Sequence, residues 1–222
     1  MDFSGPQKAE FNNVRALNRA FLNSLRTPPG AIELRQTFAP RLRPIIEGLT
    51  ELQARRLSAT PFLLLSLREQ DDDYWSALFA EDSNGDLFAM PSGDGRDRHL
   101  AAAALGFLWQ LARHNPYAVR LVSGATINWC DSLANCTLLR LLNRTADRTD
   151  LLRPRLAENL EFWRKLLGPG LSSEPKIRTA AHLSALQSML TIDRAAQYRD
   201  IRAAACKIQP PALRVAEKPD RS

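Results

Sequence analysis

The segment Leu49–Glu69 constrains the fold more than any other part of the chain, because it joins a well-marked helix start to a short apolar run. Thr50 and Gln53 have the spacing of a capping box, in which each side chain accepts a hydrogen bond from the other residue's amide. A short helix is therefore expected from Glu51 to about Ala59. The run Phe62–Leu67 that follows is apolar at almost every position, so we expect it to be buried.

Apolar and polar segments alternate after this helix and predict a small antiparallel β meander over residues 62–90. The run Phe62–Leu67 is followed by the acidic residues Asp71–Asp73 and by a second apolar run, Tyr74–Ala80. Asn84-Gly85 then separates this run from a third, and both residues accept the positive φ of a tight hairpin turn. The second run could instead form a helical turn, and this alternative stays open.

The other segments carry helical patterns. Lys8–Arg26 has apolar residues at three- and four-residue spacing, and the prolines of Thr27–Gly30 end it. Further helices are expected over residues 31–48 (one or two short helices), 99–114, 115–143 (a helix or a helix pair), 150–167, 172–191 and 192–208. We therefore predict a mostly α fold, a helical bundle with a small antiparallel β meander.

A chain of 222 residues can form one large domain or two small ones. We expect N-terminal helices plus the meander in residues 1–97 and a helical region in residues 98–208. Residues 209–222 contain three prolines and alternating charges with little to bury, so we predict that they are disordered.

Cysteine usage and hydropathy predict a cytoplasmic protein without a membrane segment. The three cysteines form no C-x-x-C pair, the first ten residues are polar, and no apolar run approaches the ~20 residues of a membrane-spanning helix. A reducing compartment is therefore expected.

The residue types that bind metals do not cluster in the sequence. Cys130 and Cys136 are six residues apart, which places them on different faces of one helix, and the three histidines are far from one another: His99, His114 and His182. Structural zinc requires four convergent ligands. We expect no metal and no cofactor.

Catalytic motifs are also missing from the sequence. Ser123 lies in a weak echo of a nucleophile turn, but the segment lacks the G-x-S-x-G frame. The glycines follow neither phosphate-loop pattern. The carboxylates of Asp71–Asp73 are better explained as a polar turn than as acid–base groups. We therefore expect a protein that is not an enzyme.

The net charge of +6 has an uneven distribution. Between Val14 and Arg56 there are eight arginines and three acidic residues. Arginine binds phosphate in a bidentate manner, so a DNA-binding surface and an ordinary solvated basic surface both stay open. The phosphate-facing candidates are Arg15, Arg19, Arg26, Arg55 and Arg56.

Three motifs in the first third of the chain resemble the FlhD subunit of the bacterial flagellar master regulator. That family has a helix of the form I-N-x-x-Y-L-x-L-A-x-R-L, then L-T-x-x-Q-x-x-K-L-A, then an apolar run ending in F-R-F-D-D. The matching segments here are Leu17–Arg26, Leu49–Ser58 and Leu67–Asp72. The resemblance implies a helical, self-associating subunit of a transcriptional regulator, in which a second subunit carries much of the DNA recognition.

The resemblance to FlhD covers only part of the chain. It spans roughly residues 14–73, and Leu65 stands where that family has its interchain cysteine.

A second segment resembles a different family. Glu174–Leu186 is similar to the D-P-x-V-R-x-A-A-x-x-A-L pattern of HEAT repeats, which implies a helical adaptor that binds another protein. We therefore expect a homo-oligomer or a protein partner, with nucleic acid as a further partner, and we rank the transcriptional regulator above the adaptor.

Overall fold

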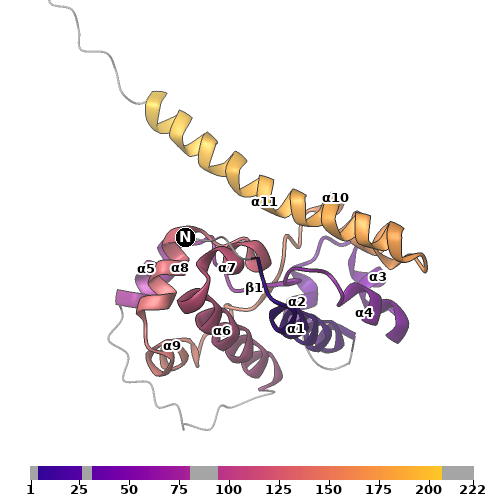
Figure 1. Cartoon of the computed structure of the whole chain (residues 1–222), viewed down its shortest axis with the longest axis horizontal. Coiled ribbons are helices and arrows are strands. Elements are labelled where there is room, and N and C mark those ends of the chain that lie inside the picture. Colours follow the sequence, from indigo (N-terminus) through magenta and orange to yellow (C-terminus); the bar gives the residue numbers. More distant parts are fainter. Residues whose placement is uncertain (1–4, 27–31, 81–94, 207–222) are drawn as a thin grey trace, which may run out of the picture.

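The computed structural model describes residues 5–26, 32–80 and 95–206, and in these ranges the chain is mostly helical (Figure 1). The elements follow in the order α1 (Lys8–Arg26), α2 (Ile32–Gln36), α3 (Arg43–Glu47), α4 (Glu51–Leu57), β1 (Leu65–Ser66), α5 (Asp72–Ala80), α6 (Arg96–His114), α7 (Pro116–Ser123), α8 (Ile127–Asn135), α9 (Leu138–Thr145), β2 (Arg153–Pro154), α10 (Leu160–Leu167), the 3-10 helix η1 (Pro169–Leu171) and α11 (Pro175–Cys206). The predicted fold class, mostly α with a small antiparallel β element, is confirmed.

The predicted capping box is present at the start of α4. The Gln53 amide donates to Thr50 Oγ1 at 3.2 Å, and the Thr50 amide donates to Gln53 Oε1 at 2.8 Å. Two of the orphan amides at the helix start are thereby satisfied. The helix ends at Leu57, close to the predicted end.

The apolar run after α4 is held against α1 by one buried amide side chain. Asn18 Nδ2 donates to Thr60 Oγ1 at 3.0 Å and to the Phe62 carbonyl at 2.8 Å, while Asn18 Oδ1 accepts from the Leu64 amide at 2.8 Å. Asn18 is fully buried, so these bonds satisfy a polar group that would otherwise be costly in the core.

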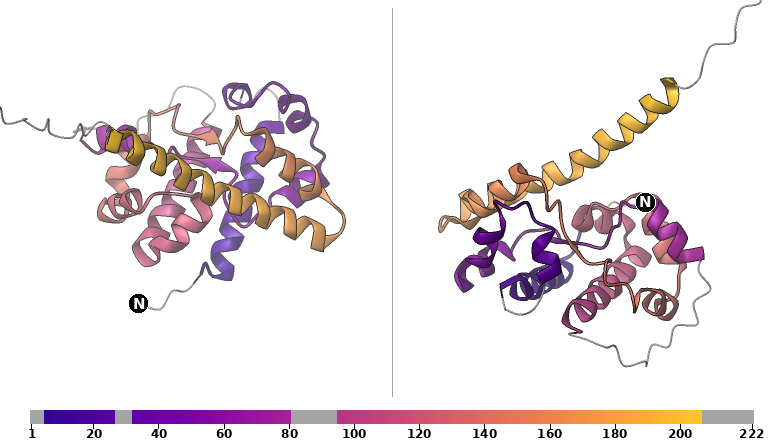
Figure 2. Two further views of the ribbon diagram at one scale, coloured as in Figure 1. Left: turned by 90° about the horizontal axis from the view of Figure 1, so that it is seen from above. Right: turned by 180° about the vertical axis from the view of Figure 1, so that it is seen from behind.

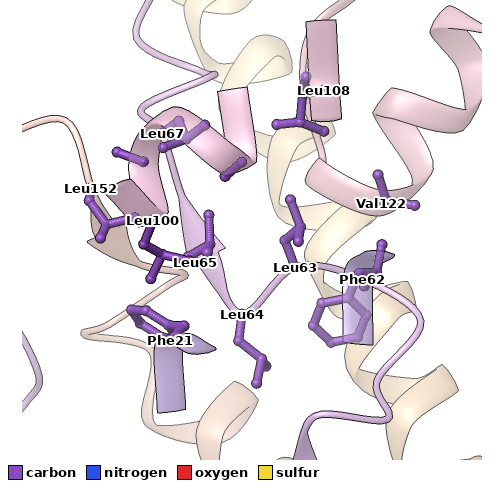
Figure 3. Close-up of a cluster of buried hydrophobic side chains, with 14 of the residues drawn as sticks. Phe21, Phe62, Leu63, Leu64, Leu65, Leu67, Leu100, Leu108, Val122 and Leu152 are labelled. Carbon is purple, nitrogen blue, oxygen red and sulfur yellow. The ribbon is translucent and has the colours of Figure 1, made fainter. Parts of the chain in front are cut away.

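The run itself lies at the centre of the molecule. Phe62–Leu65 is completely buried, and helices from both halves of the chain surround it. Figure 3 shows the neighbouring side chains, which come from α1, α6, α7 and the segment before β2: Phe21, Leu100, Leu108, Val122 and Leu152. One hydrophobic core therefore crosses the boundary predicted at residue 97. The division into a domain of residues 1–97 and a helical region of residues 98–208 stays a prediction.

The strand pairing differs from the predicted meander. β1 pairs with β2, in the antiparallel register Leu65↔Pro154 and Ser66↔Arg153, and not with a neighbour inside the described residues 62–80. The second half of the predicted meander, including Asn84-Gly85, lies outside the described residues.

The run Tyr74–Ala80 is helical and belongs to α5, so the alternative of a helical turn in place of a strand is the correct one. The Tyr74 amide donates to Asp71 Oδ1 at 3.0 Å, so Asp71 caps α5 and does not form a turn between strands. Trp75 and Leu78 are buried while Ser76 and Ala77 are exposed, and this three-residue spacing fits a helix and not a strand.

Two predicted helical segments are interrupted. Residues 115–143 form α7, α8 and the start of α9, because Gly124 ends α7 in the left-handed region at φ 69° and Thr126 caps α8. Residues 150–159 are not helical, because β2 contains Pro154 and Asn159 caps α10 by accepting from the Phe162 amide at 2.9 Å.

The predicted break near residue 191 is absent, and α11 runs unbroken from Pro175 to Cys206. Its sequence contains no proline or glycine after Pro175, so nothing in it terminates a helix. The first part of α11 packs on α10 and η1, and the last part extends beyond the other elements in Figure 1 and in the right view of Figure 2. Among the described helices, none is long and apolar enough to cross a membrane.

Candidate functional site

Three of the five predicted phosphate-facing arginines share one exposed surface on α1 and α4, which lie side by side. Arg26 contacts Glu51 near one end of the pair and Asn18 contacts Thr60 near the other, so the two helices run antiparallel. Arg15 lies one turn before Arg19 on α1. Arg55 lies one turn after Glu51 on α4, so helical geometry places it on the same face.

Glu51 borders this surface and binds two guanidinium groups. Arg19 Nη2 is 2.9 Å from Glu51 Oε1, and Arg26 Nη1 is 2.7 Å from Glu51 Oε2. The hydrogen bonds from Arg26 and then Arg19 lower the pKa of the Glu51 carboxyl below its usual value. Glu51 is therefore charged and offsets part of the positive field.

Arg15 and Arg55 have no such counter-charge. Both side chains are exposed, and neither has an ion-pair or hydrogen-bond partner within the described ranges of the chain. We use the term arginine surface for Arg15, Arg19, Arg55 and the Glu51 carboxylate that Arg19 contacts. It carries three guanidinium groups and one carboxylate, which is a net positive surface suited to an anionic ligand.

The other two predicted arginines hold the fold together. Arg26 Nε donates to the Leu49 carbonyl at 2.7 Å, and only 21% of its side chain is exposed. Arg56 Nη1 donates to the Leu171 carbonyl at 2.9 Å and ties α4 to η1. Both guanidinium groups already donate hydrogen bonds to main-chain carbonyls, so we place neither in the arginine surface.

A buried ion pair that sequence reasoning missed joins the two strands. Arg155 Nη2 lies 2.6 Å from Glu69 Oε1, and the two side chains are 4% and 1% exposed. Arg155 also donates to the carbonyls of Leu63 and Leu65, at 2.6 and 2.8 Å. Glu69 Oε2 accepts from the Leu67 amide at 2.7 Å. These extra bonds compensate part of the desolvation cost of the two charges.

A polar cavity of about 540 Å³ adjoins this ion pair. On its wall, Arg68 binds Asp71 through Nε and Nη2 at 3.1 and 2.5 Å and reaches Asp150 through Nη1 at 2.5 Å. The Arg68 guanidinium stacks 3.8 Å from the Tyr74 ring centroid. Three of the six charged side chains that line the cavity, those of Arg68, Asp71 and Arg155, are in ion pairs within the chain.

Ser123, Cys130 and His182 are of residue types that serve in catalysis, and all three are buried. Ser123 donates its hydroxyl to the Val119 carbonyl at 2.8 Å and is fully buried. Burial raises the pKa of Cys130 to about 12, which disfavours the thiolate. His182 Nε2 lies 3.1 Å from the Gly170 carbonyl, and desolvation lowers its pKa. In the described part of the chain, no three His, Cys, Asp or Glu side chains converge to hold a metal ion.

The sequence contains no local signal for the missed ion pair. Glu69 and Arg155 are 86 positions apart in the chain, and each follows residues that read as an apolar strand or a helix. No local pattern connects them. The arginine surface could be predicted in part, because helical spacing places Arg15 with Arg19 but says nothing about how α4 packs on α1.

No protein-family model, curated protein or solved structure matches this chain. The resemblances to FlhD and to HEAT repeats therefore stay predictions, and the proposals below rest on the geometry of the described residues.

Proposed function

We propose that this protein is a non-enzymatic regulator that binds the phosphate backbone of duplex DNA through the arginine surface. The observation that carries the proposal is that Arg15 and Arg55 share a face with Arg19 while having no counter-charge in the described residues. Exposed arginines on adjacent helices match the contacts that position proteins on DNA without reading its sequence. Because of the partial resemblance to FlhD, we rank a role in transcription above other roles that a DNA-binding surface could have.

The size of the surface sets the expected strength of binding. Two free arginines and a third shared with Glu51 allow contacts to about two or three phosphates. The logarithm of the binding constant should then fall with the logarithm of salt concentration with a slope of about −1.8 to −2.7. Between 50 and 200 mM salt the affinity should drop roughly 10- to 40-fold. A surface this small gives weak binding by itself, which fits a subunit that acts with a partner or as an oligomer.

The test is a fluorescence anisotropy titration of a labelled duplex DNA at several salt concentrations. Arg15→Ala and Arg55→Ala should each weaken binding and reduce the salt slope by about 1. Glu51→Gln removes the competing carboxylate and should strengthen binding at low salt. Arg140→Ala is the matched control, because Arg140 is exposed on α9, outside the arginine surface.

Two results would refute the proposal. One is the absence of detectable DNA binding at low salt. The other is a loss of affinity with Arg140→Ala that equals the loss with Arg15→Ala, since that would indicate only the overall charge of the chain.

A helical adaptor is the second candidate, and the exposed face of α11 favours it. Ile177 and Leu183 are 45% and 53% exposed and flank the exposed Ala180 on the first part of α11, the part that packs on α10 and η1. An exposed apolar strip on a helix is a common means of binding another protein. If Ile177→Glu and Leu183→Glu abolish capture of a specific partner while DNA binding is unchanged, the adaptor reading takes precedence.

A further inference from the structure

A small apolar groove lies between the chain around α3 and the helix α10. Its floor and walls come from four aliphatic side chains, which are Leu42, Ile45, Leu160 and Leu167. Ile45 is 49% exposed although it is a large aliphatic residue, and Leu42 beneath it is buried. The groove has a volume of about 280 Å³.

The two walls of the groove are held rigidly together. The rings of Phe38 and Trp163 pack edge to face with their centroids 5.0 Å apart, and the Ala39 amide donates to the Ala157 carbonyl at 3.3 Å. Both contacts join the segment before α3 to the region of α10. The groove is therefore preformed, and a ligand would not have to order it.

Each wall of the groove also contributes one exposed arginine. Arg41 stands before α3 and has no ion-pair or hydrogen-bond partner among the residues that the structure describes. Arg164 comes from α10 and, among the described residues, pairs only with Glu161, one turn away, in a bridge whose side chains are 69% and 71% exposed. An exposed pair of this kind is weak, so a ligand carboxylate can replace Glu161 at little cost.

The size and charge of the groove identify the class of ligand. Sites for small molecules and cofactors usually occupy about 300–1,000 Å³, and this groove lies just below that range. It is large enough for one or two aliphatic side chains. Its lining residues include no aromatic ring on which a nucleic-acid base could stack. The groove has an apolar floor between two arginines. A complementary ligand therefore presents an aliphatic side chain between two carboxylates.

We propose that this groove binds an acidic amphipathic helix of a partner protein. A leucine-type side chain of that helix fills the space over Leu42 and beside Ile45, and flanking Asp or Glu side chains bind Arg41 and Arg164. This helix-in-groove interaction uses a different surface from the arginine surface on α1 and α4, so it does not depend on DNA binding.

The experiment uses the full chain and a fluorescein-labelled helical peptide of about 15 residues, which gives about four helical turns. The peptide has two leucines four residues apart, a glutamate on each side of that face, and a background of alanine and glutamine. Fluorescence anisotropy should show saturable binding with a Kd on the order of 100 µM.

Variants then locate the binding site. Arg41→Glu and Ile45→Glu should each weaken binding at least about tenfold, because they remove the charge pair or place a charge in the apolar contact. Arg140→Glu on α9 is the matched charge control and should leave the affinity unchanged. All substituted positions are exposed, and thermal melting checks that each variant is folded.

Several outcomes would overturn the proposal. No saturable binding at millimolar peptide does so, as does equal binding by a peptide in which both leucines are serine. Unchanged affinity in Arg41→Glu and Ile45→Glu would place the peptide elsewhere. Light scattering adds one more outcome, since a dimer that Ile45→Glu converts to a monomer would show that a second copy of the chain occupies the groove.

Discussion

The buried side chain of Asn18 offers the sharpest test of how the fold is held together. In Asn18→Ala, the Leu64 amide loses its acceptor at a position with no solvent access. Leaving a buried donor unsatisfied costs about 1–3 kcal/mol, and each further hydrogen bond lost contributes about 0.5–1.5 kcal/mol. The Phe62 carbonyl keeps one donor, because Thr60 Oγ1 also donates to it at 3.1 Å.

These contributions give an expected destabilisation of about 2–4 kcal/mol for Asn18→Ala. The matched control is Asn13→Ala, at an exposed position on the same helix. That substitution should stabilise the protein by up to about 0.5 kcal/mol, because alanine is the better helix former. Any difference between the two variants therefore reflects the buried contacts and not the helix propensity of asparagine.

The measurement is urea unfolding at 25 °C followed by far-UV circular dichroism. The denaturation midpoint should fall for Asn18→Ala while the dependence on urea concentration is unchanged, since the surface exposed on unfolding stays the same. In a chain of this size the melting temperature should drop by about 5–15 °C. If Asn18→Ala lies within about 1 kcal/mol of Asn13→Ala, the contacts between Asn18 and the apolar run do not hold the run on α1.

Three further predictions concern buried ionisable groups. Arg155→Met should destabilise the protein by about 3–5 kcal/mol in the same assay, because it leaves the Glu69 carboxylate buried without its partner, and a change below about 1 kcal/mol would contradict this account. Iodoacetamide at pH 8 should modify Cys136 well before Cys130, whose pKa of about 12 keeps the thiol neutral, and peptide mass mapping that finds equal rates would contradict the burial of Cys130. The pKa of His182 is lower in the folded protein, so the unfolded chain binds more protons at acidic pH. The free energy of unfolding should therefore fall as the pH drops below about 6.5. His182→Gln should show a smaller fall between about pH 7.5 and about pH 5.5.

Features set by neighbours in sequence could be predicted well. The capping box of Thr50 and Gln53, the amphipathic helix Lys8–Arg26 and the Asn-Pro start of α7 all depend on residues within one or two turns, and all are present. Their signals are hydrogen-bonding side chains and prolines at fixed offsets, which act before any tertiary contact forms.

Features set by distant contacts could not be predicted. Nothing near Leu65 indicates that its strand partner is Pro154, and nothing near Asp71 distinguishes a helix cap from a turn until Trp75 is known to face the core. The candidate arginines show the same limit, because Arg15 and Arg56 look alike in the sequence. Only the packing of η1 against α4 turns the second into a donor to the Leu171 carbonyl.

The pairing of β1 with β2 has a consequence for how the molecule opens. The ladder spans only two residues on each side, yet it joins Ser66 to Arg153 and so closes a loop that contains α5 to α9. Closing a loop of this length costs roughly 4 kcal/mol in chain entropy on top of a constant. Two ladder positions cannot offset that cost alone. The packing of α6 and α7 in the common core, the Arg155–Glu69 pair and the bonds from Arg155 to the Leu63 and Leu65 carbonyls offset the rest. We expect this junction to exchange its amide hydrogens by sub-global opening, with the loop from α5 to α9 released as a unit while α1 and α4 stay paired.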